Sequence, residues 1–255
     1  MQHFTERKAF CLVNISPVRA TNADTAEIVT QLLFGEIFTA HEVKQSWCRI
    51  TTFNDHYEGW IDIKHAHFLS EKEVKKWNDM AIPQLELTRE LKTPWGNQII
   101  SRGAFIPFDN RAQFNIGAEE FELTSTTPFQ KPLYPYELAL EYLNTPYLWG
   151  GKSPFGIDCS GLTQMVYRFY DYNLPRDASQ QVEIGREVEY NDILENDLAF
   201  FENEAGKITH VGIIGEDQTI IHAAGRVRVD VLTRAGIFND ELQILTHHLK
   251  VIKRL

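Results

Sequence analysis

The chain has 255 residues, of which 43% are hydrophobic and 24% are charged, a composition typical of globular proteins. Its formal net charge is −10, so electrostatics gives no support for nucleic acid, an anionic membrane or an acidic wall polymer as a partner. No stretch approaches the roughly 20 apolar residues of a transmembrane helix, and residues 1–8 lack the apolar core of a signal peptide. We therefore expect a cytoplasmic protein.

The three cysteines, Cys11, Cys48 and Cys159, are too few and odd in number for a disulfide framework. Cys11 and Cys48 lie in apolar, strand-like stretches, which predicts buried thiols. A bridge between these two stays open as an alternative.

Residues 1–69 contain short strand-like runs separated by frequent turn signals, at residues 9–15, 37–43, 47–52 and 59–63. Residues 16–19, with the sequence Ser-Pro-Val-Arg, are expected to break the first strand. Short strands with frequent turns are typical of a small β-barrel, which we predict for residues 1–69.

Residues 70–127 are predicted to form a linker helix and a second small barrel. Ser70 and Glu73 have the spacing of a capping box at the start of that helix. Strand-like runs then follow at residues 85–91, 98–105 and 121–123.

Residues 128–255 are predicted to form a third domain of class α+β, with helices packed on an antiparallel sheet. The expected helices are residues 135–144, residues 158–171 and a short stretch after residue 177. The expected strands are residues 197–201, 208–214, 219–223 and 227–232. Residues 242–255 fit either a strand or a helix, and His247 and His248 within them are expected at the surface.

Cys159 stands at the predicted start of a helix, between Asp158 and Ser160. The positive end of the helix dipole and the unpaired N–H groups of the first turn favour a thiolate, the nucleophilic form of cysteine. The alternative is a buried cysteine that acts as a small hydrophobic residue.

His210 and His222 lie in two strand-like runs joined by a short turn. A tight hairpin centred on residue 216 places them directly opposite each other on one face. One imidazole could then take the thiol proton while the other orients it. One cysteine and two histidines also suit zinc, but paired ligands such as C-x₂-C are missing, so we expect no metal.

Several motifs in this order resemble the NlpC-type family of cysteine peptidases, which hydrolyse cell-wall peptides and have a papain-like fold. The motifs are Pro146-Tyr147-Leu148-Trp149-Gly150-Gly151, Asp158-Cys159-Ser160-Gly161, Leu174-Pro175-Arg176 with Ser179 and Gln180, Asp197-Leu198-Ala199-Phe200-Phe201, His210-Val211-Gly212-Ile213 and His222. The resemblance implies that Cys159 is the nucleophile, His210 the general base and His222 the orienting third member. It also implies that Tyr147 helps to hold the oxyanion and substrate, and that no cofactor is needed.

The first half resembles the bacterial Src-homology-3-like (SH3-like) barrels that often precede such peptidases, through Leu-Phe-Gly-Glu at residues 33–36 and Tyr-Glu-Gly-Trp at residues 57–60. The combined resemblance implies a muropeptide substrate, cut between γ-D-glutamate and a diamino acid. Glu36, Tyr57 and Asp158 become candidates for binding the free ammonium of an N-terminal L-alanine. The alternative roles are a turn residue for Glu36, barrel packing for Tyr57 and a helix N-cap for Asp158.

Ser160 and Ser179 are further candidates, for the γ-glutamyl carboxylate. Arg176 could share that role or form a structural ion pair.

Three functions fit the sequence. The leading one is a γ-D-glutamyl-L-diamino acid endopeptidase that releases L-Ala-γ-D-Glu during cell-wall recycling. The second is an exported lytic endopeptidase of cross-linked wall, and the third is a non-catalytic muropeptide-binding protein. The sequence fixes neither the preferred diamino acid nor the oligomeric state.

Overall fold

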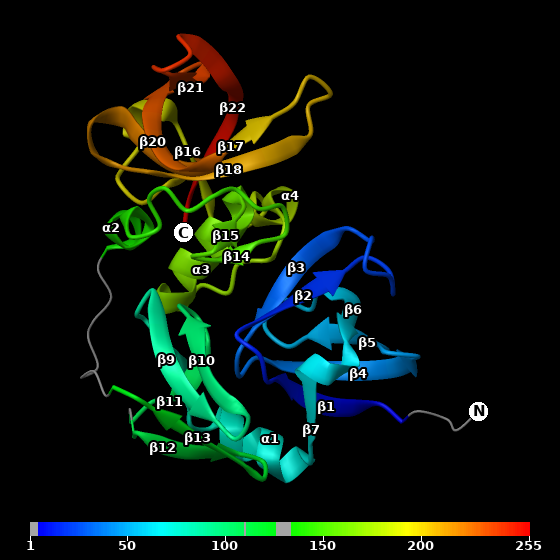
Figure 1. Cartoon of the computed structure of the whole chain (residues 1–255). Helices are drawn as coiled ribbons and strands as arrows, with labels where there is room; N and C mark the ends of the chain where they lie inside the picture. The colour runs from blue at the N-terminus through cyan, green and yellow to red at the C-terminus, as the bar shows by residue number, and fades with distance from the viewer. Residues whose placement is uncertain (1–4, 110, 126–133) are drawn as a thin grey trace. The chain divides into compact units, whose positions relative to one another are not determined.

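The computed structural model describes residues 5–109, 111–125 and 134–255, and the chain divides into two compact units, Met1–Lys131 and Pro132–Leu255 (Figure 1). The first two predicted domains fall within unit 1. The predicted boundary at residue 128 lies outside the described residues. Within the described ranges, no helix combines the length and apolar content needed to span a membrane.

The first half of unit 1 is a seven-stranded antiparallel sheet with the strand order β3-β2-β6-β5-β4-β1-β7. Its elements are β1 (Arg7–Cys11), β2 (Ile15–Arg19), β3 (Ile28–Leu33), β4 (Ile37–Lys44), β5 (Trp47–Thr52), β6 (Glu58–Asp62), the 3₁₀ turn η1 (Ile63–His65) and β7 (Ala66–Leu69). Alternate residues of these strands bury a core that includes Ala9, Val18, Phe38, Ile50 and Ile61. Cys11 and Cys48 are buried free thiols, as predicted, with no bridge between them.

The predicted break at residues 16–19 is wrong, because these residues belong to β2. Pro17 lies opposite Gln31 of β3, while β2 meets its other neighbour, β6, at Arg19 and Trp60. Pro17 is therefore tolerated because β2 needs few ladder bonds on its second side.

The second half of unit 1 consists of helix α1 and two small ladders. Its elements are α1 (Glu71–Asn78), β8 (Ala81–Pro83), β9 (Thr88–Thr93), β10 (Gly96–Ser101), β11 (Phe105–Pro107), β12 (Gln113–Ile116) and β13 (Glu119–Leu123). The capping box at the start of α1 forms as predicted, because the Ser70 hydroxyl accepts from the Glu73 N–H and the Glu73 carboxylate accepts from the Ser70 N–H. Four strands pair in the order β10-β9-β13-β12, and β11 pairs with β8.

Aromatic side chains join the two halves of unit 1 into one core. Phe121 of β13 packs edge-on against Phe10 of β1 and against Phe34, with ring centroids 6.2 and 5.3 Å apart. The indole of Trp77 in α1 donates to the Gly35 carbonyl at 2.9 Å. The regions predicted as two barrels therefore fold as one unit.

Unit 2 contains short helices and a second seven-stranded antiparallel sheet. Its elements are α2 (Pro135–Leu140), β14 (Lys152–Ser153), β15 (Gly156–Ile157), α3 (Cys159–Tyr167), η2 (Arg168–Tyr170), α4 (Ala178–Gln181), β16 (Arg186–Val188), η3 (Tyr190–Asp192), β17 (Leu198–Glu202), β18 (Ile208–Ile214), η4 (Glu216–Gln218), β19 (Thr219–Ala224), β20 (Arg226–Thr233), β21 (Gly236–Asn239) and β22 (Ile244–Arg254).

The sheet of unit 2 has the order β16-β22-β17-β18-β19-β20-β21, and β22 pairs with β21 as well as with β17. Six strands therefore close into a ring, which Figure 1 shows as the curled orange and red ribbon. The C-terminal segment is thus a strand, and its length lets it pair with β16 and β17 near one end and with β21 near the other. Phe201, Ile220, Leu232 and Ile252 lie in the core cluster of this sheet.

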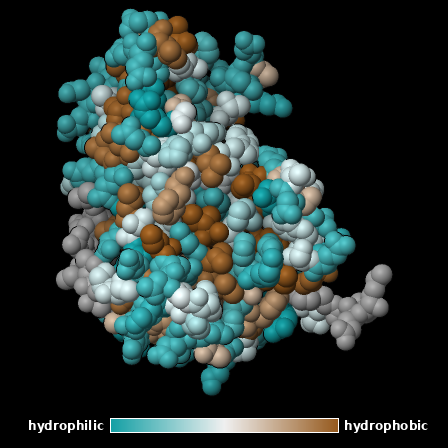
Figure 2. Space-filling view, in the orientation of Figure 1, coloured by the Kyte–Doolittle hydropathy of each residue, from teal (hydrophilic) through white to brown (hydrophobic). Residues whose placement is uncertain are grey.

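Helix α3 packs against β18 and β19, which bear the two histidines of the predicted site. All nine residues of α3 are buried, so its position is set by packing on every side. The face visible in Figure 2 is mostly hydrophilic with scattered hydrophobic patches.

Candidate active site

Cys159 is the first residue of α3, and its side chain faces the neighbouring strand β18. Asp158 caps the helix by accepting from the Gly161 N–H at 2.7 Å. Val211, the residue after His210, directs its backbone N–H to the Cys159 thiol. A side chain on Gly161 would meet the Gly151 carbonyl oxygen at 2.2 Å, so only glycine lets the start of the helix sit this close.

Cys159 is a neutral thiol in the resting protein. Burial raises its pKa to about 12, and the charge of Asp158 acts in the same direction. The N–H groups of Val211 and Ser160 and the charge of Arg176 lower the pKa, but they do not outweigh burial. The helix terminus therefore does not by itself produce the thiolate expected from the sequence.

His210 is also neutral at rest. Burial, followed by the neighbouring His222 and His247, lowers its pKa well below the usual value. A neutral imidazole beside a neutral thiol can act as a base that takes the proton while the sulfur attacks.

His210 and His222 form a hydrogen-bonded pair, with 2.8 Å between Nε2 of His210 and Nδ1 of His222. The predicted register is wrong by two residues, because Gly212 and not His210 lies opposite His222. The histidines still share one face, since a shift of two preserves the side-chain alternation. The missing side chain of Gly212 leaves room for the pair, as a Cβ there would lie 3.0 Å from the Cβ of His222.

Asp230 extends the histidine pair and was not singled out from the sequence. Its Oδ2 lies 3.0 Å from Nε2 of His222, and its Oδ1 accepts from Nη2 of Arg228 at 2.9 Å. In the β19–β20 ladder His222 is paired with Arg228, so Asp230 lies two residues further along on the same face. The alternation of strand faces along residues 226–233 could have placed Asp230 beside His222, but only if the pairing register of β19 and β20 had been known.

His247 of β22 is not the surface residue expected from the sequence. Its ring stacks on that of His210, with centroids 4.1 Å apart and an interplanar angle of 24°. Burial lowers the pKa of His247 to about 4. His248, the next residue, is exposed as predicted.

The three imidazoles of His210, His222 and His247 each offer a nitrogen within 4.8 Å of the others, the spacing of a possible metal site. Their arrangement suits a metal poorly. The rings of His210 and His247 are stacked, so their in-plane lone pairs do not converge on one point. The nitrogens of His210 and His222 already share a hydrogen bond.

Tyr147 lies close enough to Cys159 for their charges to interact, and it is partly buried. Its backbone forms an isolated bridge with Ile157, just before the helix cap. Burial, followed by the charges of Cys159 and Asp158, raises its pKa to about 12. The hydroxyl therefore stays protonated and can donate to an oxyanion near the sulfur.

Asp158 is engaged in a buried ion pair, which favours the N-cap role over binding of a substrate ammonium. Nη1 and Nη2 of Arg176 lie 3.0 and 2.6 Å from its two oxygens, and the Gly150 N–H adds a bond of 2.8 Å. Arg176 also donates to the Ser160 hydroxyl at 2.9 Å. Arg176 thus has the structural role left open by the sequence, and Ser160 is buried beside it.

The remaining substrate candidates differ in exposure. Ser179 is exposed in α4. Glu36 is buried in unit 1, where its carboxylate accepts from the Leu33 N–H at 2.8 Å and from Asn54 at 3.3 Å. This geometry is that of a turn residue. Tyr57 is partly buried in the loop before β6, with its N–H bonded to the Thr52 hydroxyl at 2.8 Å.

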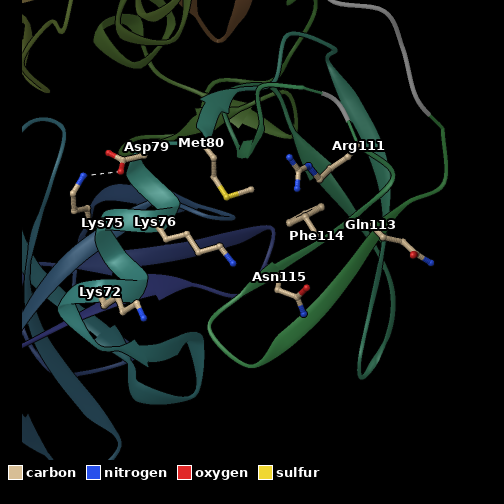
Figure 3. Close-up of a pocket in the computed structure, with 9 residues that line it drawn as sticks. All are labelled: Lys72, Lys75, Lys76, Asp79, Met80, Arg111, Gln113, Phe114 and Asn115. Atoms are coloured by element: carbon tan, nitrogen blue, oxygen red, sulfur yellow. Dashed lines mark hydrogen bonds and ion pairs between the residues drawn. The ribbon is translucent and has the colours of Figure 1, made fainter.

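Unit 1 also contains a basic hollow of about 480 Å³ beside α1 (Figure 3). It is lined by Lys72, Lys75, Lys76, Asp79, Met80, Arg111, Gln113, Phe114 and Asn115. Lys75 pairs with Asp79 at 2.7 Å, and Arg111 pairs with Asp109 at 2.8 Å. These pairs offset half of the positive charge, and the remaining lysines, Lys72 and Lys76, are exposed on α1.

Comparison with known families gives two matches. Residues 144–245 match the NlpC/P60 family, and residues 18–65 match the bacterial dipeptidyl-peptidase Sh3 domain. All four predicted catalytic residues lie in the first matched segment, and Glu36 and Tyr57 lie in the second.

Two relatives carry the name gamma-D-glutamyl-L-lysine dipeptidyl-peptidase. The protein from Bacillus subtilis (strain 168) is 42% identical over 105 residues, which cover 40% of this chain and 36% of that protein. The protein from Bacillus cereus (strain ATCC 10987 / NRS 248) is 26% identical over 233 residues, which cover 80% of this chain and 68% of that protein. The chain thus matches only about a third of the B. subtilis relative's length.

A crystal structure of an NlpC/P60 family protein from B. cereus ATCC 10987 has the same fold. It superposes with a TM-score of 0.78 over 97% of this chain and 99% of that chain, at 18% identity. Together the matches confirm the predicted α+β class, with an SH3-like β-domain before a papain-like domain.

Proposed function

We propose that the chain, whose residues 144–245 match the NlpC/P60 family, is a cysteine peptidase that hydrolyses the γ-D-glutamyl–L-diamino acid bond of peptidoglycan stem peptides. The observation that carries the proposal is the grouping of a helix-capped cysteine with a buried pair of histidines 2.8 Å apart. The two relatives named for γ-D-glutamyl-L-lysine cleavage support the choice of bond.

The proposed reaction is acyl transfer through a thioester. His210 takes the Cys159 proton as the sulfur attacks the γ-glutamyl carbonyl carbon. The oxyanion is stabilised by the Tyr147 hydroxyl and the Cys159 backbone N–H, which is free at the first turn of α3. The amine of the diamino acid leaves with the proton from His210, and water then hydrolyses the thioester with His210 as base.

The proposed substrate is a released muropeptide with a free N-terminal L-alanine, and the product is L-Ala-γ-D-Glu. A net charge of −10 disfavours attachment to acidic wall polymers, which supports a small fragment over intact wall. Recycling in the cytoplasm is part of the same proposal.

The test is mass spectrometry of L-Ala-γ-D-Glu-L-lysine and its diaminopimelate counterpart, each with a free and an acetylated N-terminus. We expect wild type to release L-Ala-γ-D-Glu from the free peptides only. Cys159→Ala should release none, and Cys48→Ala, which removes a buried thiol of unit 1, should match wild type. Equal cleavage of acetylated peptides and cross-linked sacculi would favour the exported lytic enzyme. Tight peptide binding without cleavage would favour the non-catalytic binding protein.

A further inference from the structure

The hydrogen-bond chain through His210 and His222 ends on a buried carboxylate that has no role in the mechanism given so far. Asp230 is 7% exposed, and its Oδ2 faces Nε2 of His222 at 3.0 Å. On its far side Arg228 lies 2.8 Å from Oδ2 and donates to Oδ1 at 2.9 Å. Arg228 in turn contacts Glu241 at 3.2 Å near the surface.

Asp230 is ionised at neutral pH. Burial raises its pKa, but the hydrogen bonds from His222 and Arg228 outweigh burial and leave the pKa below its usual value. An ionised carboxylate can only accept hydrogen bonds. Nε2 of His222 must therefore carry a proton and donate it to Asp230.

The proton on Nε2 of His222 determines which nitrogens carry protons in the hydrogen-bonded series of His222 and His210. In the neutral form of His222 one ring nitrogen donates and the other accepts, so with Nε2 as the donor its Nδ1 is the acceptor. Nε2 of His210, which lies 2.8 Å from that nitrogen, is then the donor. This leaves Nδ1 of His210 without a proton, which is the state a base needs to take one from the Cys159 thiol.

We infer that Asp230 is a positioning residue of this site, which fixes the tautomers of His222 and His210 so that Nδ1 of His210 is the base. The site is then a four-residue series, Cys159, His210, His222 and Asp230. Arg228 forms an ion pair with the Asp230 carboxylate, and the His247 ring stacks on the His210 ring with centroids 4.1 Å apart. The inference deepens the proposed function and rests on it for its kinetic arm.

The matched substitution is Asp230→Asn, which keeps the shape of the side chain. An amide has one acceptor oxygen, whereas His222 and Arg228 approach Asp230 from both sides as donors. The amide nitrogen must face one of these donors, so the protonated Nε2 of His222 is no longer fixed. The control is Glu241→Gln, which removes an exposed carboxylate from the same arginine.

We expect Asp230→Asn to lower kcat by about 10- to 100-fold with KM unchanged within about twofold, as for outer carboxylates that orient functional histidines. Glu241→Gln should leave both constants within about twofold. An unchanged kcat in Asp230→Asn, or an equal loss in both variants, would overturn the inference.

A second readout does not depend on turnover. The ¹⁵N shifts of histidine rings distinguish the two tautomers and the imidazolium, so they report the protons of His210 and His222 directly. In wild type we expect both residues as the Nε2–H tautomer, and in Asp230→Asn a mixture for His222. Any other wild-type form contradicts the inference even where the variant fails to fold. Should wild type cleave no peptide yet show these tautomers, the proposed function fails and the positioning by Asp230 stands.

Discussion

The buried ion pair between Arg176 and Asp158 holds the start of α3, and its removal gives a quantitative test of how the nucleophile is placed. The guanidinium and carboxylate side chains are 2% and 8% exposed, with two contacts of 2.6 and 3.0 Å. Arg176→Met removes the charge while keeping much of the side-chain volume. Asp158 is then left as a buried carboxylate with only backbone and hydroxyl donors, from Gly150, Gly161 and Ser160.

Breaking one side of a buried pair costs about 3–5 kcal/mol, because the remaining charge is uncompensated. We therefore expect Arg176→Met to lower the free energy of unfolding of unit 2 by that amount. The control is Arg226→Met, since Arg226 and its partner Glu241 are 45% and 58% exposed. An exposed pair of this kind contributes about 0–1 kcal/mol.

The assay is hydrogen exchange of the peptides that contain α3, measured over a series of urea concentrations. Peptide-level exchange is needed because the two compact units need not unfold together. The double variant Asp158→Asn with Arg176→Met should be less destabilised than Arg176→Met alone, since asparagine still caps a helix and carries no charge. A loss below about 1 kcal/mol in Arg176→Met would refute the reasoning.

Four further results are expected. Gly212→Ala places a Cβ 2.7 Å from Ile220 and 3.0 Å from His222, so it should lower kcat by displacing the histidine pair. The control Gly206→Ala strains a backbone with φ of 75° but meets no close neighbour, so it should lower stability and leave kcat unchanged. Tyr147→Phe should lower kcat by about 10²- to 10³-fold with little change in KM, as for loss of one oxyanion donor; a change in KM alone would contradict that role. Because burial raises the Cys159 pKa to about 12, alkylation by iodoacetamide should accelerate steadily from pH 6 to 9, and a flat rate over that range would instead indicate a thiolate–imidazolium pair. His210 acts as a base only when neutral, and burial and its neighbours lower its pKa. Activity should therefore persist below the usual histidine range and disappear as the pH falls through that lowered pKa. His247→Phe removes one of the groups that lower the pKa of His210, so it should move the acidic side of the pH–activity profile to higher pH; an unchanged profile would exclude this effect of His247.

Much of the site could be predicted because its signals are local in the chain. The capping box of Ser70 and Glu73, the helix that begins at Cys159 and the strands that carry His210 and His222 all depend on residues within a few positions of one another. The motifs around Cys159 and His210 also pointed to the family that the comparisons then identified. The catalytic and substrate roles themselves remain predictions.

The parts that were missed depend on long-range register. The turn after β18 contains Asp217 and Gln218 with φ of 51° and 57°, and this left-handed turn shifted the His210–His222 pairing by two residues. Nothing local indicates left-handed backbone at a glutamine. Asp230 and His247 came into the site only because β20 pairs with β19 and because β22 closes the ring of strands.

Burial opposes the thiolate that the helix terminus favours at Cys159, because it raises the pKa of the thiol. The helix terminus contributes a partial charge, whereas full burial of the thiol removes the solvation of a whole charge. Burial could not be judged from the residues next to Cys159. Similarly, the SH3-like match covers residues 18–65 only, so a second barrel within residues 70–127 stays a prediction.

The central claim, that Cys159 attacks the γ-glutamyl carbonyl with His210 as its base, is tested most directly by trapping the thioester. Wild type mixed with L-Ala-γ-D-Glu-L-lysine and quenched in acid within the first turnover should gain the mass of one L-Ala-γ-D-Glu acyl group. Peptide mapping should place it on Cys159, and Cys159→Ala and His210→Ala should gain none. Release of L-Ala-γ-D-Glu without any acylated protein, or an acyl group on another residue, would contradict the account.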